Sequence, residues 1–186
     1  MRKQEVRSKN EKESAGSGLE NGFDWMSSII TALVVVAILF AFVCRVVSVD
    51  GESMTNTLQD GDRLLITSQY NTPAYGDIVV VNREGAAPLI KRVIGLPGDR
   101  ISIEKRSGIV YRNGKPLDEP YTRDGFTPTN GMTDEITVPE GQLFVLGDNR
   151  GDSLDSRWLG PISADNVVGK VLVRLMPNFG KVTNGE

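Results

Sequence analysis

The sequence predicts an all-β domain tethered by one N-terminal transmembrane helix. An uncharged apolar run covers residues 25–44 of the 186-residue chain. From residue 45 onward, short runs rich in Val and Ile recur between turn residues, and no helical period persists. A chain of this length has room for one ordinary domain with small appendages. We therefore expect three parts, namely residues 1–24, 25–44 and 45–186.

The first part, residues 1–24, is polar and mixes basic and acidic side chains with Ser, Gly and Asn. Such a segment buries too little apolar surface to fold alone, so it is predicted to be a flexible tail. The next part, Trp25 to Cys44, would span roughly 30 Å as a helix, which matches the hydrocarbon core of a bilayer. A buried core helix is the alternative, but the run has no polar face to show to water.

A cleaved secretory signal is a second alternative for residues 25–44, but its apolar region would be shorter and would end in small residues. This run ends in F-V-C-R-V-V, which favours a retained anchor. Five Lys and Arg residues precede it, and this bias predicts a cytoplasmic N-terminus. Residues 45–186 would then lie outside the cytoplasm, on the outer face of a cell membrane.

The third part, residues 45–186, shows the strand signals. They are RVVSV, DRLLIT, DIVVV, LIKRVI, DRISIE, GIVYR, EITV, QLFVL and VVGKVLVRL. Asn113-Gly114, between GIVYR and KPL, predicts a tight hairpin turn. Residues 118–134 carry no strand pattern and are predicted to form an exposed loop or small flap.

Absences narrow the possible chemistry. The chain has no histidine, which excludes a Ser-His-Asp triad and any His-ligated metal. Its single cysteine, Cys44, excludes internal disulfides and a Cys-cluster zinc site. The net charge of −3 gives no reason to expect nucleic acid as a partner. No metal or organic cofactor is implied, and hydrolytic chemistry would have to use Ser, Thr, Lys, Asp or Glu.

Ser53 is the candidate nucleophile, because it lies in the segment V-D-G-E-S-M-T-N-T-L, which is too polar for a core. A serine hydroxyl needs a neighbouring base, and without histidine that base would be a lysine of depressed pKa. Lys91 lies inside the apolar strand P-L-I-K-R-V-I-G and shares a face with Leu89 and Val93. A snorkelling lysine whose amine reaches water is the alternative. Lys170, the other strand lysine, is the internal comparison.

Residues 147–160, G-D-N-R-G-D-S-L-D-S-R-W-L-G, are too dense in Asp, Arg and Ser for an ordinary hairpin loop. Charge-assisted contacts between the acidic and basic side chains would stiffen this loop. Its hydroxyl groups are suited to orient a neutral amine. A solvated loop is the alternative interpretation. The residues concerned are Asp148, Arg150, Ser153, Asp155, Ser156 and Arg157.

Together these blocks resemble the bacterial type I signal peptidases, which are membrane-bound Ser/Lys endopeptidases. Four blocks match in order, namely S-M-x-x-T-L at 53–58, G-D-I-V-V at 76–80, K-R-V-I-G-L-P-G-D at 91–99 and G-D-N-R-x-x-S-x-D-S-R at 147–157. The short chain and single span resemble the Gram-positive members. The resemblance implies a coiled β-strand fold, shared with the self-cleaving SOS repressors. It also implies cleavage of signal peptides from secretory preproteins after small residues, in an Ala-x-Ala pattern.

The resemblance further implies residue roles. Ser53 would form an acyl-enzyme, with its own backbone N–H stabilising the oxyanion, and Lys91 would act as general base and later proton donor. Ser153 would hydrogen-bond the Lys91 amine, and Asp155 would pair with Arg157. Asp148 and Arg150 would hold the loop. The residues expected to line the substrate pockets are Val49, Met54, Leu58, Leu89 and Ile90.

Two positions depart from variants of the family pattern. Some members add a hydroxyl two residues before the nucleophile, where this chain has Gly51 and at most a backbone group. The family usually has proline before the Thr-Leu of the serine box, where this chain has Asn56. Because proline fixes φ, we expect Asn56 to reduce rigidity without loss of chemistry.

Two other functions remain open from the sequence. One is a membrane-tethered β-domain that binds signal peptides or partner proteins without cleaving them, and Asn56 is its support. The other is a self-cleaving regulator with the same Ser/Lys pair. The second is disfavoured because the sequence shows an anchor and no DNA-binding module.

Overall fold

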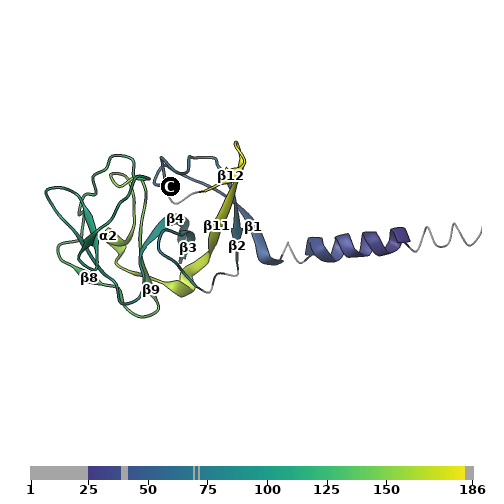
Figure 1. The fold of residues 1–186 in the computed structure, drawn as a ribbon, viewed down its shortest axis with the longest axis horizontal. Helices are drawn as coiled ribbons and strands as arrows, with labels where there is room; N and C mark the ends of the chain where they lie inside the picture. The colour runs from purple at the N-terminus through teal and green to yellow at the C-terminus, as the bar shows by residue number, and fades with distance from the viewer. Residues whose placement is uncertain (1–24, 39–41, 69, 71, 183–186) are drawn as a thin grey trace, which may run out of the picture. The chain divides into compact units, whose positions relative to one another are not determined.

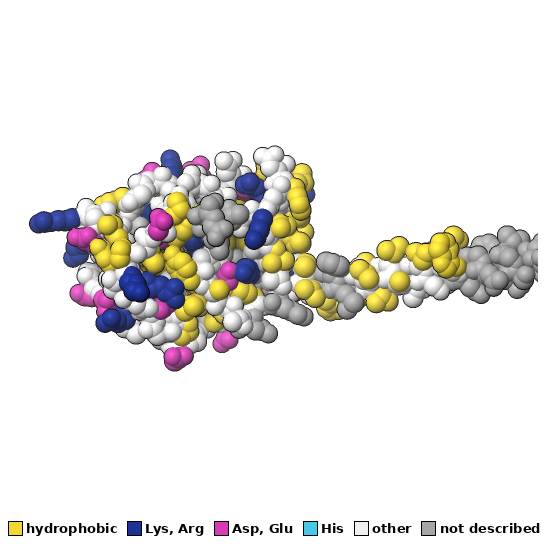
Figure 2. Space-filling view, viewed as in Figure 1, with side chains coloured by type: hydrophobic (Ala, Val, Ile, Leu, Met, Phe, Trp, Pro, Cys, Tyr) yellow, Lys and Arg dark blue, Asp and Glu magenta, His cyan; other side chains and the backbone are white. Residues whose placement is uncertain are grey.

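The computed structural model describes residues 25–38, 42–68, 70 and 72–182. The chain divides into two compact units, Met1–Phe42 and Val43–Glu186. In the first unit a helix covers residues 25–38, and exposed apolar side chains lie along it (Figure 2). No helix among the described residues is long and apolar enough to cross a membrane. The expected tail and residues 39–41 of the expected span lie outside these residues, and Cys44 begins a strand.

The second unit is built on two antiparallel sheets (Figure 1). Within the described residues, eight strands form the larger sheet in the order β1-β2-β11-β3-β4-β9-β10, with β12 paired to β11. Its strands are β1 (Cys44–Ser48), β2 (Arg63–Thr67), β3 (Ile78–Arg83), β4 (Ala86–Gly95), β9 (Gln142–Leu146), β10 (Ile162–Ser163), β11 (Val167–Met176) and β12 (Gly180–Lys181). The predicted β-sheet fold is therefore confirmed for the described part of this unit, whose secondary structure is mostly β-strand.

The smaller sheet has four strands in the order β7-β6-β5-β8. They are β5 (Arg100–Ile103), β6 (Val110–Arg112), β7 (Lys115–Pro116) and β8 (Ile136–Thr137). The expected Asn113-Gly114 hairpin joins β6 to β7, and both residues have the positive φ angles, 54° and 76°, that such a turn requires. Two short helices complete the unit, α2 (Ser156–Leu159) and the 3-10 helix η1 (Ala164–Asn166). Figure 1 shows β8 and α2 on the opposite side of this unit from β1 and β2.

Both faces of the central strands of the larger sheet, β3, β9 and the second half of β4, are buried, which explains why these strands have continuous apolar runs. Side chains alternate along β3, so that Val80 packs in one cluster with Ile66 and Met54. Val79 and Val81 pack in another cluster on the other side, together with Val93 and Val145. A third cluster joins β9 to the smaller sheet, mainly through Phe144, Leu146 and Ile101. The register of β4 is thus fixed from both faces.

The segment 118–134 contains neither helix nor strand, as its sequence predicts. It is not uniformly exposed, however, because Tyr121, Thr127 and Met132 are buried. Met132 enters the third apolar cluster, and Tyr121 lies under the Arg92 guanidinium at 3.9 Å from its ring centre. The expectation of an exposed flap is wrong for these residues, because apolar and stacking contacts hold the segment against the sheets.

Candidate active site

The serine-bearing segment leaves β1 and folds into consecutive tight turns. The N–H of Leu58 donates to the Met54 carbonyl at 2.8 Å, which closes the second turn. Asn149, in the loop after β9, also holds this segment in place through two hydrogen bonds. The Asn149 N–H donates to the Ser53 carbonyl at 3.0 Å, and its side-chain amide donates to the Glu52 carbonyl at 3.1 Å. Ser53 therefore has a fixed backbone on a turn that remains partly open to solvent.

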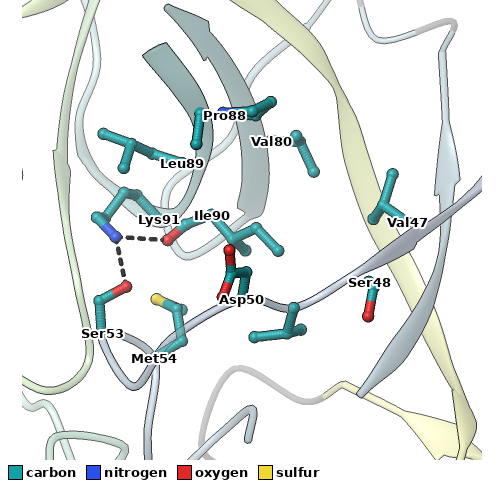
Figure 3. Close-up of a pocket in the computed structure, with 12 residues that line it drawn as sticks. Val47, Ser48, Asp50, Ser53, Met54, Val80, Pro88, Leu89, Ile90 and Lys91 are labelled. Carbon is teal, nitrogen blue, oxygen red and sulfur yellow. Dashed lines mark hydrogen bonds between the residues drawn. The ribbon is translucent and has the colours of Figure 1, made fainter. Parts of the chain in front are cut away.

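Lys91 lies in the middle of β4 and meets Ser53. Its Nζ donates to Ser53 Oγ at 2.6 Å and to the Ile90 carbonyl at 2.9 Å (Figure 3). The side chain is only 1% exposed, so the snorkelling alternative is wrong. The cross-strand neighbour of Lys91 is Val79, which belongs to an apolar cluster, as strand alternation predicts.

Burial lowers the pKa of Lys91 to about 8, because a desolvated ammonium is unfavourable. The nearby charges act in both directions. The carboxylates of Asp155 and Asp148 raise this pKa, whereas the guanidiniums of Arg83 and Arg157 lower it. Desolvation is the dominant cause, and it brings the neutral amine within reach of physiological pH.

Lys170 shows that a strand position alone does not produce this environment. Its ammonium forms an ion pair with Asp77 at 2.6 Å, and its side chain is 36% exposed. The same aspartate accepts hydrogen bonds from the Tyr70 hydroxyl and the Ala74 N–H. Lys170 is thus part of a stabilising ion-pair network.

The loop after β9 packs closely against the backbone of Ser53 at Gly147. A Cβ atom added to Gly147 would lie 2.2 Å from Ser153 Oγ and 2.5 Å from the Ser53 carbonyl oxygen. Only glycine allows this close approach. Ser153 is buried beside it, but its Oγ has no hydrogen-bond partner among the described residues. The expected hydrogen bond from Ser153 to the Lys91 amine is therefore not formed, because that amine is directed to Ser53 and Ile90 instead.

Asp155 and Arg157 form the expected ion pair, and both side chains are fully buried. Two parallel hydrogen bonds of 2.8 and 2.7 Å join the guanidinium to the carboxylate. Asp155 also caps α2 by accepting from the Arg157 N–H, and it accepts from the Gly147 N–H at 3.1 Å. This single carboxylate therefore fixes the close approach of Gly147 to Ser53.

Asp148 and Arg150 hold the loop through partners outside it. Asp148 takes two hydrogen bonds, of 2.9 and 2.7 Å, from the guanidinium of Arg92, the neighbour of Lys91. It also accepts from the Thr57 hydroxyl at 2.5 Å. Asp148 thus links the serine segment to the lysine strand. Arg92 and Thr57 were not predicted as site residues, although both lie inside the matched blocks.

Arg150 is equally buried and points to the segment 118–134. Its guanidinium forms a bidentate ion pair with the Glu119 carboxylate, through hydrogen bonds of 2.9 and 2.6 Å. It also donates to the Thr127 hydroxyl at 2.6 Å. Glu119 and Thr127 were missed because their segment carries no pattern beyond its lack of strand signals. Both residues lie more than 20 positions from Arg150 in the sequence, so local patterns do not predict their contacts with it.

A cavity of about 180 Å³ opens beside the Ser53 and Lys91 side chains (Figure 3). Four of the five expected pocket residues line it, namely Val49, Met54, Leu89 and Ile90. Leu58 does not, because the turn that follows Met54 directs it into the core, where it is fully buried. Six lining residues were not expected to be there. They are Val47, Ser48, Asp50, Val80, Ala87 and Pro88.

The two departing positions have specific conformations. Asn56 has a φ of 99°, and its side-chain amide donates to the carbonyls of Thr122 and Tyr121 at 3.2 and 3.4 Å. It therefore fastens the serine segment to the segment 118–134, and the expected loss of rigidity is offset by these contacts. The Gly51 N–H donates to the Asp60 carboxylate at 2.8 Å, so it is already engaged.

Comparison with known proteins identifies the family. The family model "Signal peptidase, peptidase S26" matches residues 22–176. Signal peptidase IB of Staphylococcus aureus is 37% identical over 172 residues, which cover 83% of this chain and 89% of that protein. A probable signal peptidase I-1 of Synechocystis is 36% identical over 161 residues, 80% of each chain.

A solved structure is also similar, a signal peptidase I from Enterococcus faecalis. It has 32% sequence identity and a TM-score of 0.44, and the match covers 55% of this chain and 98% of that one. The family model and the two sequence relatives each extend over most of the chain. The chain therefore belongs to the peptidase S26 family of signal peptidases, and specifically to the bacterial type I group.

Proposed function

We propose that this protein is a membrane-bound serine endopeptidase that cleaves signal peptides from exported preproteins through a Ser53/Lys91 dyad. Family membership supports signal-peptide cleavage. The observation that carries the dyad is the 2.6 Å contact between the buried Lys91 amine and Ser53 Oγ. With no histidine in the chain, a lysine whose pKa is lowered to about 8 is the base that the site supplies.

In the proposed first step, the neutral Lys91 amine takes the hydroxyl proton as Ser53 Oγ attacks the scissile carbonyl. The tetrahedral intermediate then collapses, the C–N bond breaks, and the Lys91 ammonium gives its proton to the leaving amine. This leaves an ester between Ser53 and the signal peptide. Water, deprotonated by the neutral amine, attacks that ester and releases the peptide, and the proton returns to Ser53.

The developing oxyanion would be stabilised by the Ser53 backbone N–H, which has no hydrogen-bond acceptor among the described residues. The Gly51 N–H is a poor second donor because it is bound to Asp60. Asn149 fixes the Ser53 carbonyl and so helps to keep this N–H in one orientation. Oxyanion stabilisation would therefore come mainly from this one backbone group.

The cavity supports a preference for small side chains next to the cut. Val49 and Met54 form part of the apolar wall of this cavity, whose volume of about 180 Å³ leaves room for small side chains. Leu89 and Ile90 complete this apolar part of the lining. We expect it to admit alanine at the first and third positions before the scissile bond.

The membrane anchor completes the proposal. The uncharged run that begins at Trp25 would span the bilayer once and end before Cys44, which begins β1, with residues 1–24 in the cytoplasm and the β unit outside it. Ser53 is nine residues past Cys44, so an extended link reaches about 30 Å at most. Signal peptides present their cleavage sites at the same membrane surface, so the secretory preproteins and the lipid bilayer are the expected partners.

The test is processing of a preprotein with an Ala-x-Ala signal, using the full chain in detergent. Ser53→Ala and Lys91→Met should each lower kcat by at least about a thousandfold, while Lys170→Met should keep most of the activity. Cleavage that survives Ser53→Ala would refute the dyad. Binding of the signal peptide without cleavage by wild type would favour the non-cleaving β-domain.

A further inference from the structure

The cavity beside Ser53 contains one carboxylate. Among its lining residues, Asp50 is the only acidic side chain and Lys91 the only basic one. The remaining side chains are apolar or carry a hydroxyl. Figure 3 shows Asp50 between Val47 and Ser48 on one side and Ser53 and Met54 on the other. This charge therefore lies in the same cavity as Ser53, where we propose that the substrate binds.

The Asp50 carboxylate is available for a ligand. It has no hydrogen bond or ion pair within the described part of the chain, and the residue is exposed. The neighbouring aspartates differ, since Asp60 accepts from the Gly51 N–H and Asp62 accepts from the Gln59 N–H. Asp50 therefore contributes nothing visible to the turn that holds Ser53.

The backbone around Asp50 is nevertheless fixed. The Val49 N–H donates to the Asp62 carbonyl at 2.8 Å, and the Val49 carbonyl accepts from Gly61 at 3.0 Å. On the other side, Gly51 is bound to Asp60. A carboxylate on a fixed backbone keeps its place relative to Ser53, which a mobile surface aspartate would not do.

The sequence spacing gives the range of this carboxylate. Asp50 precedes Ser53 by three residues, so the two Cα atoms lie within about 10 Å. An extended peptide advances about 3.3 Å per residue. The substrate residues whose backbone can lie beside Asp50 are therefore those within about three residues of the scissile bond.

We propose that Asp50 is a specificity-determining residue that favours substrates with a Lys or Arg side chain within about three residues of the cut. The inference rests on the proposed function. A basic substrate side chain would pair with the free carboxylate, whereas an acidic one would be repelled. The Lys91 amine does not compensate for Asp50, because it is already engaged by Ser53 and the Ile90 carbonyl. Arg83 does not line the cavity and donates to the Ala87 carbonyl.

The test uses quenched fluorescent peptides built on one Ala-x-Ala signal sequence, assayed with the full chain in detergent at low salt. Lys, Gln or Glu is placed in turn at each non-alanine position within three residues of the cut. Glu52→Gln is the matched control for Asp50→Asn, because Glu52 is an exposed neighbour of equal charge that does not line this cavity. Both variants change the net charge by one.

At one or more positions, wild type should cleave the Lys peptide about two- to fivefold faster than the Glu peptide in kcat/KM. The preference should shrink as salt is added. Asp50→Asn should bring the ratio of kcat/KM between the Lys and Glu peptides to about one, and Glu52→Gln should leave this ratio as in wild type. If wild type shows no preference for the Lys peptide, or if Asp50→Asn keeps that preference, the proposed role of Asp50 is refuted and the proposed peptidase function still stands. No cleavage of any peptide by wild type overturns the proposed function as well.

Discussion

At the scale of single residues, the chemistry of the site depends on the burial of one amine. An exposed lysine with a pKa near 10.4 is neutral in fewer than about one molecule in a thousand at pH 7. Burial lowers the pKa of Lys91 to about 8, so about one molecule in ten is neutral at that pH. Desolvation thus raises the fraction of competent base by about two orders of magnitude.

This pKa gives a pH-dependence prediction. Because the neutral amine is the proposed base, kcat/KM should rise about tenfold per pH unit below pH 8 and level off above it. The Arg83 guanidinium lowers the Lys91 pKa, so Arg83→Gln should move the rising limb to higher pH. The measurement is a pH profile of peptide cleavage for both proteins. If the rising limb of kcat/KM moved to lower pH in Arg83→Gln, this result would contradict the assignment of Lys91 as the titrating base.

Asn56 provides a second prediction, because its backbone conformation excludes the residue usual in the family. Proline fixes φ near −65°, whereas Asn56 has a φ of 99°. Asn56→Pro should therefore distort the turn beside Ser53, and we expect kcat to fall by at least tenfold. Asn56→Gly permits the same φ and loses only the amide contacts to the 118–134 segment.

The two Asn56 variants are compared by steady-state cleavage of one peptide and by thermal unfolding. Asn56→Gly should retain more activity than Asn56→Pro. Equal or higher activity of the proline variant would mean that the serine turn readily adopts another conformation. In that case the contacts of Asn56 with residues 121 and 122 would not position the nucleophile.

At the scale of structural elements, Asp148 joins three parts of the site. It binds Arg92 of β4 and Thr57 of the serine segment while standing in the loop after β9. Both members of the Arg92–Asp148 pair are fully buried. Removing one member leaves the other charge buried without its counter-ion, which costs about 3–5 kcal/mol.

Asp148→Asn should accordingly lower the free energy of unfolding by about 3–5 kcal/mol at pH 7, measured by urea denaturation. Asp152→Asn is the control, since Asp152 lies in the same loop and is exposed. We expect the control to change stability by less than about 0.5 kcal/mol. Similar losses in the two variants would show that the effect comes from loop charge in general.

The same elements show what the sequence could predict. Strand alternation placed Lys91 among aliphatic side chains, and the pairing of β3 with β4 agrees with it. The dense charges of residues 147–160 indicated ion pairs, and Asp155–Arg157 is one of them. The partners of Asp148 and Arg150 could not be predicted, because they lie on β4 and at Glu119, far along the chain. Such pairings depend on tertiary packing that local patterns do not encode.

The position of Leu58 shows a second limit. An apolar residue next to a reactive serine suits either a substrate pocket or the core, and composition does not distinguish the two. The hydrogen bond from the Leu58 N–H to the Met54 carbonyl closes a turn that directs the Leu58 side chain into the core. Asp50 shows the converse, because a charged residue between Val49 and Gly51 gives no sequence signal that it lines a cavity.

At the scale of the whole molecule, the site belongs entirely to the unit Val43–Glu186. Ser53, Lys91 and the loop after β9 are held by the apolar clusters and ion pairs of that unit. The contribution of the first 42 residues in our proposal is to keep the enzyme at the membrane. Anchoring and catalysis should therefore be separable.

A truncated chain that begins at Val43 tests this separation. Because the β unit contains its own buried clusters, the truncated protein should unfold cooperatively and should cleave a detergent-solubilised Ala-x-Ala peptide with kcat/KM within about tenfold of the full chain. When expressed in bacteria, the full chain should remain with the membranes after alkaline carbonate extraction, as an uncharged run of 20 residues predicts. The truncated chain should be released. Release of the full chain would refute the proposed anchor, whereas a folded but inactive truncation would mean that the N-terminal residues take part in the chemistry itself.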